Sequence, residues 1–463
     1  MGWIPVAAPA GRTLSGLLQT HCWPRCLRLA SSRPTPSLDP SLPTDDMESP
    51  SRRKAFAAHL KRTRSRAQAL PQPLVDALRR SVAEFSVADL RRDAAALSYR
   101  LAARRPPTED AEMQARAQAL EQQYISQREQ VNEQKLKQFV IQQLRQQVYH
   151  WQPLEMASAY EAAVYAVARL APEFASLLYC FRQVAARDPA FGPQAVLSYG
   201  SAVGAALWAA RHLWPDKVAE FVGIERRRYL SELCALLAHG GRADAPPDPS
   251  VFLRPLLPSS SRLRYPLVVA AHALMEQPSQ SERLELVCSL WDRTAPGGRL
   301  MLLETGTNAG FLLVLEARDL VLRLAAQRDG APVHVEAPCP HDGECPRFSR
   351  SLTPCHFRVP YWPLALGGAA PAEVRHAPLS YVVMRKGARP AGDRQWPRVV
   401  QPVLCRHKHV ICRLCTARGA LEEVVVTRRR HGPELYQCAK KVSWGDTMPV
   451  ELRDSPPDRA GDR

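Results

Sequence analysis

The sequence predicts an α/β protein built on a doubly wound, mostly parallel sheet, and three observations support this. Short apolar runs at 194–199, 220–224, 265–270 and 298–303 alternate with segments that have helical spacing. The first run leads directly into a glycine turn and a helical segment, the connection expected after a parallel strand. At 463 residues, the chain is long enough for this domain and further parts.

The first 38 residues are expected to be a mitochondrial transit peptide. They contain no Asp or Glu, since the first acid is Asp39, and their basic residues are Arg12, Arg25, Arg28 and Arg33. This predicts a protein of the mitochondrial matrix, whose reducing chemistry argues against a disulfide framework for the twelve cysteines. No later segment offers about 20 uninterrupted apolar residues, so no transmembrane helix is expected.

Residues 39–154 are expected to form a helical N-terminal region. Within it, 39–50 has the composition of a linker, and 51–105 is rich in Ala and Arg and mostly helical. From Thr108 to Trp151 the chain contains neither Pro nor Gly, which predicts one long polar helix with Thr108 as its N-cap.

The sheet domain is expected to cover residues 155–390 and to contain a cysteine-rich insertion at 331–362. A further apolar strand at 380–384 follows that insertion, which therefore lies between two late strands of one sheet. Residues 391–450 contain short strand-like runs and basic patches, and predict a small β-rich appendage. Residues 451–463 are expected to be a disordered tail.

The charge of the chain points to a polyanionic partner. The formal net charge is +17 and the isoelectric point is about 9.6, which favours nucleic acid over a merely solvated basic surface. The expected phosphate contacts, with Tyr436 and Trp444 as nearby aromatic residues, are Arg428, Arg429, Arg430, His431, Lys440 and Lys441.

The turn after the first strand is a candidate site for an adenosine-containing ligand. Gly200, Ser201 and Gly204 place backbone N–H groups at a helix N-terminus, where they can face a carboxylate or phosphate. Glu225 ends the next strand and is placed to accept from ribose hydroxyls. Because Ala202 interrupts the dinucleotide pattern, S-adenosylmethionine is favoured over NAD; a scaffold with an empty site remains the alternative.

No convincing catalytic residue is visible. His272 and Glu276 follow the strand at 265–270 and could act as bases, but a lone histidine at a strand end is more often structural. No Asn/Asp-Pro-Pro-Tyr motif follows that strand.

The cysteines predict a metal site assembled from two distant segments. Cys339, Cys345 and Cys355 lie in the insertion, and the fourth ligand is expected to be Cys415 or Cys412, with Cys405 and Cys438 as weaker candidates. Zinc would accept four thiolates or three with His341 or His356. A [4Fe–4S] cluster would accept four thiolates, and unliganded thiols are the third alternative.

Several motifs occur together in the order found in one family. They are Tyr199-Gly200-Ser201 through Gly204, Leu207-Trp208-Ala209, Glu304 to Gly310, Glu316 to Val321, Cys339 to His341 with Cys345-Pro346, Trp396 to Arg398, His409-Val410 before Cys415, and Ser443 to Asp446. Over roughly residues 155–450 the chain resembles the methyltransferase-like assembly factors of the mitochondrial small ribosomal subunit.

This resemblance implies a Rossmann-like class I methyltransferase fold, S-adenosylmethionine binding and a [4Fe–4S] cluster held by Cys339, Cys345, Cys355 and Cys415. It also implies partners in the small-subunit precursor, namely its rRNA and ribosomal proteins, and support of mitochondrial translation without membrane insertion. Where the family's turn reads Asp-Phe-Gly-Ser-Gly, this chain has Ser198-Tyr-Gly-Ser-Ala202, which suggests that catalysis was lost. The alternative is an active S-adenosylmethionine-dependent mitochondrial rRNA methyltransferase.

Overall fold

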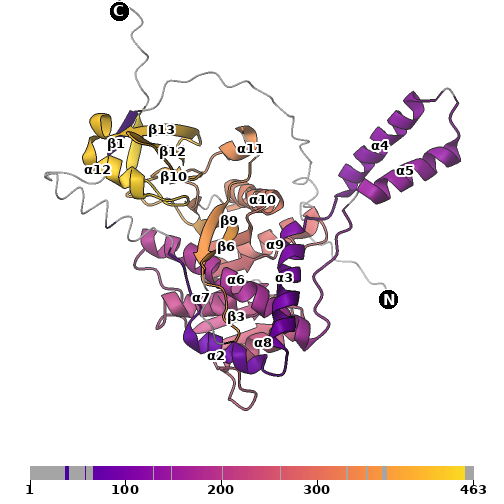
Figure 1. Cartoon of the computed structure of the whole chain (residues 1–463), viewed down its shortest axis with the longest axis horizontal. Coiled ribbons are helices and arrows are strands. Elements are labelled where there is room, and N and C mark those ends of the chain that lie inside the picture. Colours follow the sequence, from indigo (N-terminus) through magenta and orange to yellow (C-terminus); the bar gives the residue numbers. More distant parts are fainter. Residues whose placement is uncertain are drawn as a thin grey trace, which may run out of the picture. The chain divides into compact units, whose positions relative to one another are not determined.

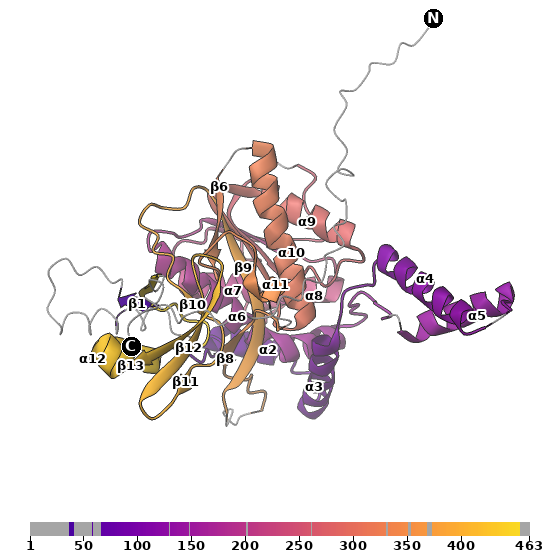
Figure 2. The ribbon, with the colours of Figure 1, turned by 90° about the horizontal axis from the view of Figure 1, so that it is seen from above.

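A computed structural model describes residues 37–40, 58 and 66–453, except 129, 148, 201, 261, 330–331, 351–352 and 368–372. The expected transit peptide therefore lies almost entirely outside the described residues. Figure 1 and Figure 2 show a central sheet with helices on both faces.

The sheet has the strand order of class I methyltransferases. Along the sheet the strands are β4 (Val251–Arg254), β3 (Glu220–Ile224), β2 (Ala195–Tyr199), β5 (Tyr265–Ala271), β6 (Thr294–Thr305), β9 (Arg375–Lys386) and β7 (Val333–Ala337). The strands from β4 to β6 pair in parallel, whereas β9 runs antiparallel to both β6 and β7. A further strand, β8 (Phe357–Tyr361), pairs with β9. The predicted fold class is therefore confirmed.

Alternate residues of each strand enter separate cores on the two faces of the sheet. Val196 joins one core and its neighbour Leu197 joins the other, as the two-residue period of a strand requires. The first core is closed by α2 (Gln72–Ser81), α3 (Val87–Ala103), α6 (Ala159–Arg187), α7 (Ala205–Leu213) and α8 (Arg228–Ala238). The second is closed by α9 (Gln280–Asp292) and α10 (Asn308–Leu324), which continues into the π-helical turn η2 (Ala325–Asp329).

Among the described residues, α6 alone is long and apolar enough to span a membrane. In its most apolar window, 78% of the residues are buried inside the protein, as expected for a core helix.

The predicted single long helix after Thr108 is wrong. Two helices, α4 (Asp110–Ser126) and α5 (Glu133–Gln147), form a hairpin that Figure 1 shows extending from the sheet domain. Asn132 ends the connection and accepts a hydrogen bond from the amide of Lys135 (3.1 Å), which is the geometry of an N-cap. The rings of Tyr124 and Phe139 then pack across the hairpin with centroids 5.1 Å apart.

The expected linker and tail each contain a short strand. β1 (Ser37–Pro40) pairs antiparallel with β14 (Val450–Arg453). These strands overlap the ends of the segments expected to be presequence, linker and tail, so pairing between distant residues gives regular structure at these boundaries.

The C-terminal appendage is a small sheet covered by a helix. Its strands are β10 (Arg398–Val399), β12 (His409–Cys415), β11 (Leu404–Cys405) and β13 (Leu421–Thr427). The helix α12 (Arg428–Lys441) occupies the basic segment for which no helix was expected, and packs Leu435 and Tyr436 into the appendage core. The cysteine-rich segment, with the short helix α11 (Pro346–Arg350), lies between β7 and β9.

Candidate functional site

The turn between β2 and α7 adopts a left-handed backbone at three described positions. Gly200 has φ of 69°, Gly204 has φ of 79° and Ala202 has φ of 42°. The first two are glycines, which tolerate this conformation, but Ala202 has a Cβ that makes it costly. Ser201, the remaining expected ligand-binding residue of the turn, lies outside the described residues.

Glu225 is buried and already bonded to protein groups. One carboxylate oxygen accepts from the amide of Ala202 (2.9 Å) and from Nη2 of Arg227 (2.8 Å), and the other accepts from the amide and Nε of Arg227 (3.0 and 2.7 Å). The Glu225 side chain is only 2% exposed. The oxygens that the sequence assigned to ribose hydroxyls are therefore occupied by this turn and by Arg227.

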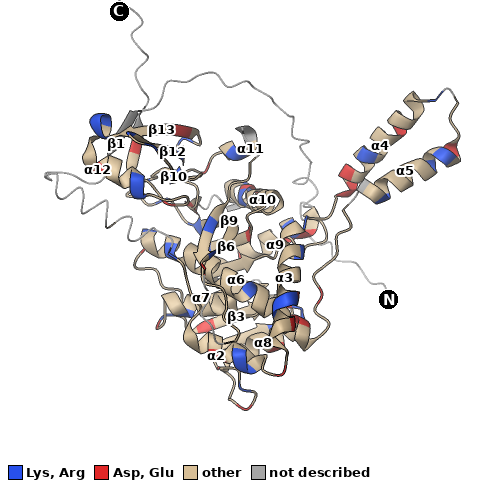
Figure 3. Cartoon of the chain, in the orientation of Figure 1, with Lys and Arg blue, Asp and Glu red and all other residues tan. Residues whose placement is uncertain are grey.

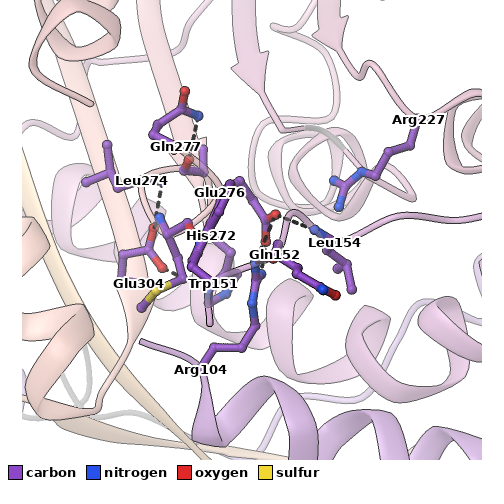
Figure 4. Close-up of polar contacts among 12 residues, drawn as sticks. Arg104, Trp151, Gln152, Leu154, Arg227, His272, Leu274, Glu276, Gln277 and Glu304 are labelled. Carbon is purple, nitrogen blue, oxygen red and sulfur yellow. Dashed lines mark hydrogen bonds and ion pairs between the residues drawn. The ribbon is translucent and has the colours of Figure 1, made fainter. Parts of the chain in front are cut away.

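Segments of the N-terminal region cover the carboxyl end of β5 (Figure 4). Glu276 forms an ion pair with Arg104 and also accepts from the amide of Leu154 (3.0 Å). The indole of Trp151 donates to the carbonyl of Met275 (3.1 Å). The cavity left beside Gly200 measures about 40 Å³, far below the roughly 300 Å³ at which ligand pockets begin.

His272 is also held by neighbouring side chains. Its Nε2 lies 2.8 Å from Nη2 of Arg169, and its Nδ1 lies 3.7 Å from a carboxylate oxygen of Glu304. The other oxygen of Glu304 accepts from the amides of Leu274 and Met275. Both base candidates from the sequence, His272 and Glu276, thus take part in internal contacts of a closed cleft.

The four expected metal ligands come together from the insertion and the appendage. Cys339 follows β7, Cys345 precedes α11, Cys355 precedes β8 and Cys415 ends β12. Burial, followed by the Cys339, Cys355 and Cys345 thiols, raises the pKa of Cys415 well above its ordinary value. Burial and Cys339 likewise raise the pKa of Cys345 to about 11. The thiols are therefore near enough to disfavour one another's ionisation.

Cys412 belongs to a different environment from Cys415. It lies three residues earlier on the same strand, so its side chain lies on the opposite face, inside the appendage core. Burial and the neighbouring Cys405 thiol raise its pKa to about 12. Cys438 in turn interacts with Cys412 rather than with the four-thiol group.

Three buried arginines surround the four thiols. Arg318 interacts with Cys339, Cys345 and Cys415; Arg347 interacts with Cys355; and Arg398 interacts with Cys339 and Cys355. The exposed fractions of these arginines are 3%, 5% and 1%.

Each of the three arginines has one buried nitrogen without a hydrogen-bond partner among the described residues. These atoms are Nε of Arg318, Nε of Arg347 and Nη2 of Arg398. Buried polar atoms of this kind are costly unless a partner is present. The arrangement therefore fits an anionic group bound at the thiols.

The zinc alternative involving histidine has partial support from geometry. Nε2 of His341 lies 3.4 Å from Sγ of Cys415, and its Nδ1 has no described partner. His356 instead contacts the ring of Trp444 and the carbonyl of Pro354.

In the described part of the chain, no group of three or more His, Cys, Asp or Glu side chains is arranged to hold a metal ion.

The expected phosphate contacts divide into exposed and structural residues. Arg428, Arg429, Arg430, Lys440 and Lys441 are exposed on α12 and form no ion pair with a described residue (Figure 3). His431 instead accepts from the amide of Thr427 (3.1 Å). Tyr436 is buried, although Nζ of Lys440 lies 5.3 Å from the centroid of its ring, and Trp444 packs on His356.

Comparison with known proteins identifies relatives across most of the chain. The family model described as mitochondrial small ribosomal subunit Rsm22 matches residues 159–449. The human mitochondrial ribosome assembly protein METTL17 is 38% identical over 372 residues, which cover 79% of this chain and 80% of that protein. A mitochondrial Rsm22-cox11 tandem protein of Schizosaccharomyces pombe is 28% identical over 293 residues, covering 56% of this chain and 39% of its own.

Solved structures with partial similarity include methyltransferases. The O-methyltransferase TomG from Streptomyces achromogenes has 15% identity and a TM-score of 0.28, covering 51% of this chain and 92% of its own. The plantazolicin methyltransferase BpumL has 13% identity and a TM-score of 0.30, covering 46% and 84%. The fold assignment rests on the strand order rather than on these superpositions.

Proposed function

Because the chain belongs to the mitochondrial small ribosomal subunit Rsm22 family, we propose that it is an assembly factor of the mitochondrial small ribosomal subunit. This membership is the observation that carries the proposal, and it confirms the relationship suggested by the sequence motifs. The human relative, 38% identical, is a mitochondrial ribosome assembly protein. The protein would act in the mitochondrial matrix on a precursor of the subunit and thereby support mitochondrial translation.

The proposed contact with rRNA is the exposed basic surface of α12. Its five Lys and Arg side chains have no described ion-pair partner and are free to neutralise phosphates. Charge of this kind positions a protein on RNA without reading its sequence.

The test of this function uses cells that depend on the chain. Depletion should reduce assembled small subunits while leaving large subunits intact, as measured by sedimentation of mitochondrial extracts. Replacing Arg428, Arg429 and Arg430 with Gln should reduce co-sedimentation with small-subunit precursors and flatten the salt dependence of RNA binding by about 0.7–0.9 per lost phosphate contact. Equal loss of both subunits would contradict the proposal.

We further propose that Cys339, Cys345, Cys355 and Cys415 hold a [4Fe–4S] cluster. Four thiolates satisfy such a cluster, and the unpartnered nitrogens of Arg318, Arg347 and Arg398 would donate to its negative charge. When bound, the cluster would join the insertion to the appendage and stabilise both.

Anaerobically purified protein should be brown and should contain iron and sulfide. A colourless protein with one zinc per chain would replace the cluster with a zinc site. Replacing Arg318 with Gln should lower cluster content without removing a ligand, because the cluster's charge would lose a buried partner.

We propose that the cleft at Gly200, Gly204 and Glu225, together with Ser201, binds S-adenosylmethionine weakly and transfers no methyl group. The closed cleft supports this, because a ribose could reach Glu225 only after Arg227 is displaced. Calorimetry should detect tighter S-adenosylmethionine binding to Arg227→Met and none to Glu225→Ala. Loss of one rRNA methyl mark in cells with Glu225→Ala, reproduced with purified protein, would instead support the methyltransferase alternative.

A further inference from the structure

A second and larger cavity lies beside β7, the last strand of the sheet, away from the Gly200 turn that follows β2. Its volume is about 320 Å³, which is within the range of small-ligand pockets. It is lined by the C-terminal end of α6, by β7, by Arg385 of β9 and by the loop from Pro390 to Trp396. Arg385 pairs in register with Arg299, six residues before the end of β6, which places the cavity away from the carboxyl ends of the parallel strands.

The carboxylates that line this cavity are paired by arginines behind them. Glu336 accepts two hydrogen bonds from Arg299 (2.9 and 3.1 Å), and Asp393 accepts from Arg389 (2.7 Å). Neither of these arginines lines the cavity. The two acidic side chains are therefore largely neutralised, and what charge they retain favours the charged form of Arg187.

Unlike these two carboxylates, Arg187 has no partner of opposite charge within ion-pair distance among the described residues. Arg187 lines the cavity, and its guanidinium forms no hydrogen bond or ion pair with any residue that the structure describes. Burial, followed by the nearby Arg398, lowers the pKa of Arg187. Arg187 is half-buried and its guanidinium forms no internal pair, so it remains available to an anion, and its planar fork suits phosphate and carboxylate.

The remaining lining suits a flat, polar ring attached to that anion. Trp396 supplies an aromatic wall, and base–aromatic stacking contributes about 1–3 kcal/mol per base. His334 lies 2.9 Å from the carbonyl of Gly387 through Nδ1, so Nδ1 is the protonated nitrogen and Nε2 is an acceptor. Gln183 and Thr447 add further polar groups.

We propose that this cavity binds a mononucleotide, with the phosphate on Arg187 and the base against Trp396. The nucleotide can be free or an unpaired residue of an RNA, since both present the same phosphate and base. This site is separate from the closed cleft and from the four thiols, and it does not depend on the proposed function.

The experiment is equilibrium binding of adenosine and uridine 5′-monophosphate to the full chain, followed by tryptophan fluorescence and calorimetry. Saturable binding is expected. Adenosine, which lacks the phosphate, should bind with an affinity at least about tenfold lower, because a charge-assisted contact is lost. Competition by a trinucleotide would identify RNA as a source, and no competition would identify free nucleotide.

Two variants on α6 distinguish a binding residue from a structural one. Arg187→Gln should weaken nucleotide binding by about tenfold or more while leaving the melting temperature of the unliganded protein unchanged or raised, because the substitution breaks no hydrogen bond or ion pair with a described residue. Arg182→Gln is the matched control, since Arg182 bonds to Gln68 outside the cavity and should leave binding unchanged. No saturable binding, equal binding by Arg187→Gln, or a lower melting temperature of that variant would overturn the proposal.

Discussion

The ion pair between Glu225 and Arg227 allows a quantitative test of the closed cleft. Arg227→Met keeps much of the side-chain volume but removes both guanidinium hydrogen bonds to Glu225. The Glu225 carboxylate, which is 2% exposed, would then keep only the hydrogen bonds from the backbone amides of Ala202 and Arg227. Removing one partner of a buried ion pair lowers the free energy of unfolding by about 3–5 kcal/mol. Because two amide donors remain on Glu225, we expect a loss of about 3 kcal/mol for Arg227→Met.

The double variant separates pairing from burial. In Glu225→Gln/Arg227→Met neither charge is left buried alone, so we expect it to recover about 2 kcal/mol relative to Arg227→Met. The matched control is Arg228→Met. Arg228 pairs with Glu232 at 2.6 Å, but these side chains are 78% and 52% exposed, so its loss should leave the free energy of unfolding nearly unchanged.

The assay is urea unfolding followed by circular dichroism, with the free energy of unfolding extrapolated to water. If Arg227→Met and Arg228→Met were equally stable, the Glu225 contact would contribute nothing measurable. Arg227 would then not hold the Glu225 carboxylate strongly enough to keep a ligand from it.

Three further predictions concern the thiols and the turn. Cys415→Ser should abolish cluster binding, whereas Cys412→Ser should leave the visible absorbance intact; the reverse result would show that the fourth ligand was misassigned. Ala202→Gly should raise the free energy of unfolding by up to about 1 kcal/mol by relieving the left-handed backbone, while Ala209→Gly inside α7 should lower it by about 1 kcal/mol. The cluster-free protein should lose stability in alkaline solution. Because folding raises the pKa of Cys345 to about 11, the stabilising thiol form is fully present below about pH 8.5 and is lost as the pH rises through 11. A Cys345→Ala variant with an unchanged pH profile of thermal melting would contradict this.

Uniform apolar strands could be predicted from the sequence, and strands containing charge could not. The runs at β2, β3 and β5 are read directly because nearly every residue is apolar. β7 was missed because His334 and Glu336 interrupt its apolar pattern. The structure explains the interruption, since Arg299 of β6 pairs with Glu336 inside the protein and offsets the cost of its burial.

The helical errors have local causes. The hairpin at α4 and α5 depends on one N-cap, Asn132, within a sequence whose composition favours helix throughout. The opposite error occurred at α12, where Gly432 and Pro433 argue against a helix. The structure accommodates them with a kink at Gly432, whose φ is 77°.

The candidate sites were predictable to different degrees. Cysteine spacing indicated that the insertion and the appendage would meet, but it did not distinguish Cys415 from Cys412; strand alternation does. The Glu225–Arg227 pair was not anticipated, although three arginines follow Glu225 directly in the sequence. The direction in which a side chain points depends on tertiary packing and cannot be obtained from composition.

The separation of the four thiols along the chain has a consequence for biosynthesis. Cys355 precedes Cys415 by about 60 residues, and only the last few dozen residues follow Cys415. A chain entering the organelle from its N-terminus therefore cannot complete the four-thiol group until nearly all of it has arrived. A product truncated by premature termination before β12 would carry three thiols beside three unneutralised arginines. If the four thiols hold the proposed cluster, a truncated polypeptide would lack it, and the finished polypeptide alone would gain the stability that the cluster provides.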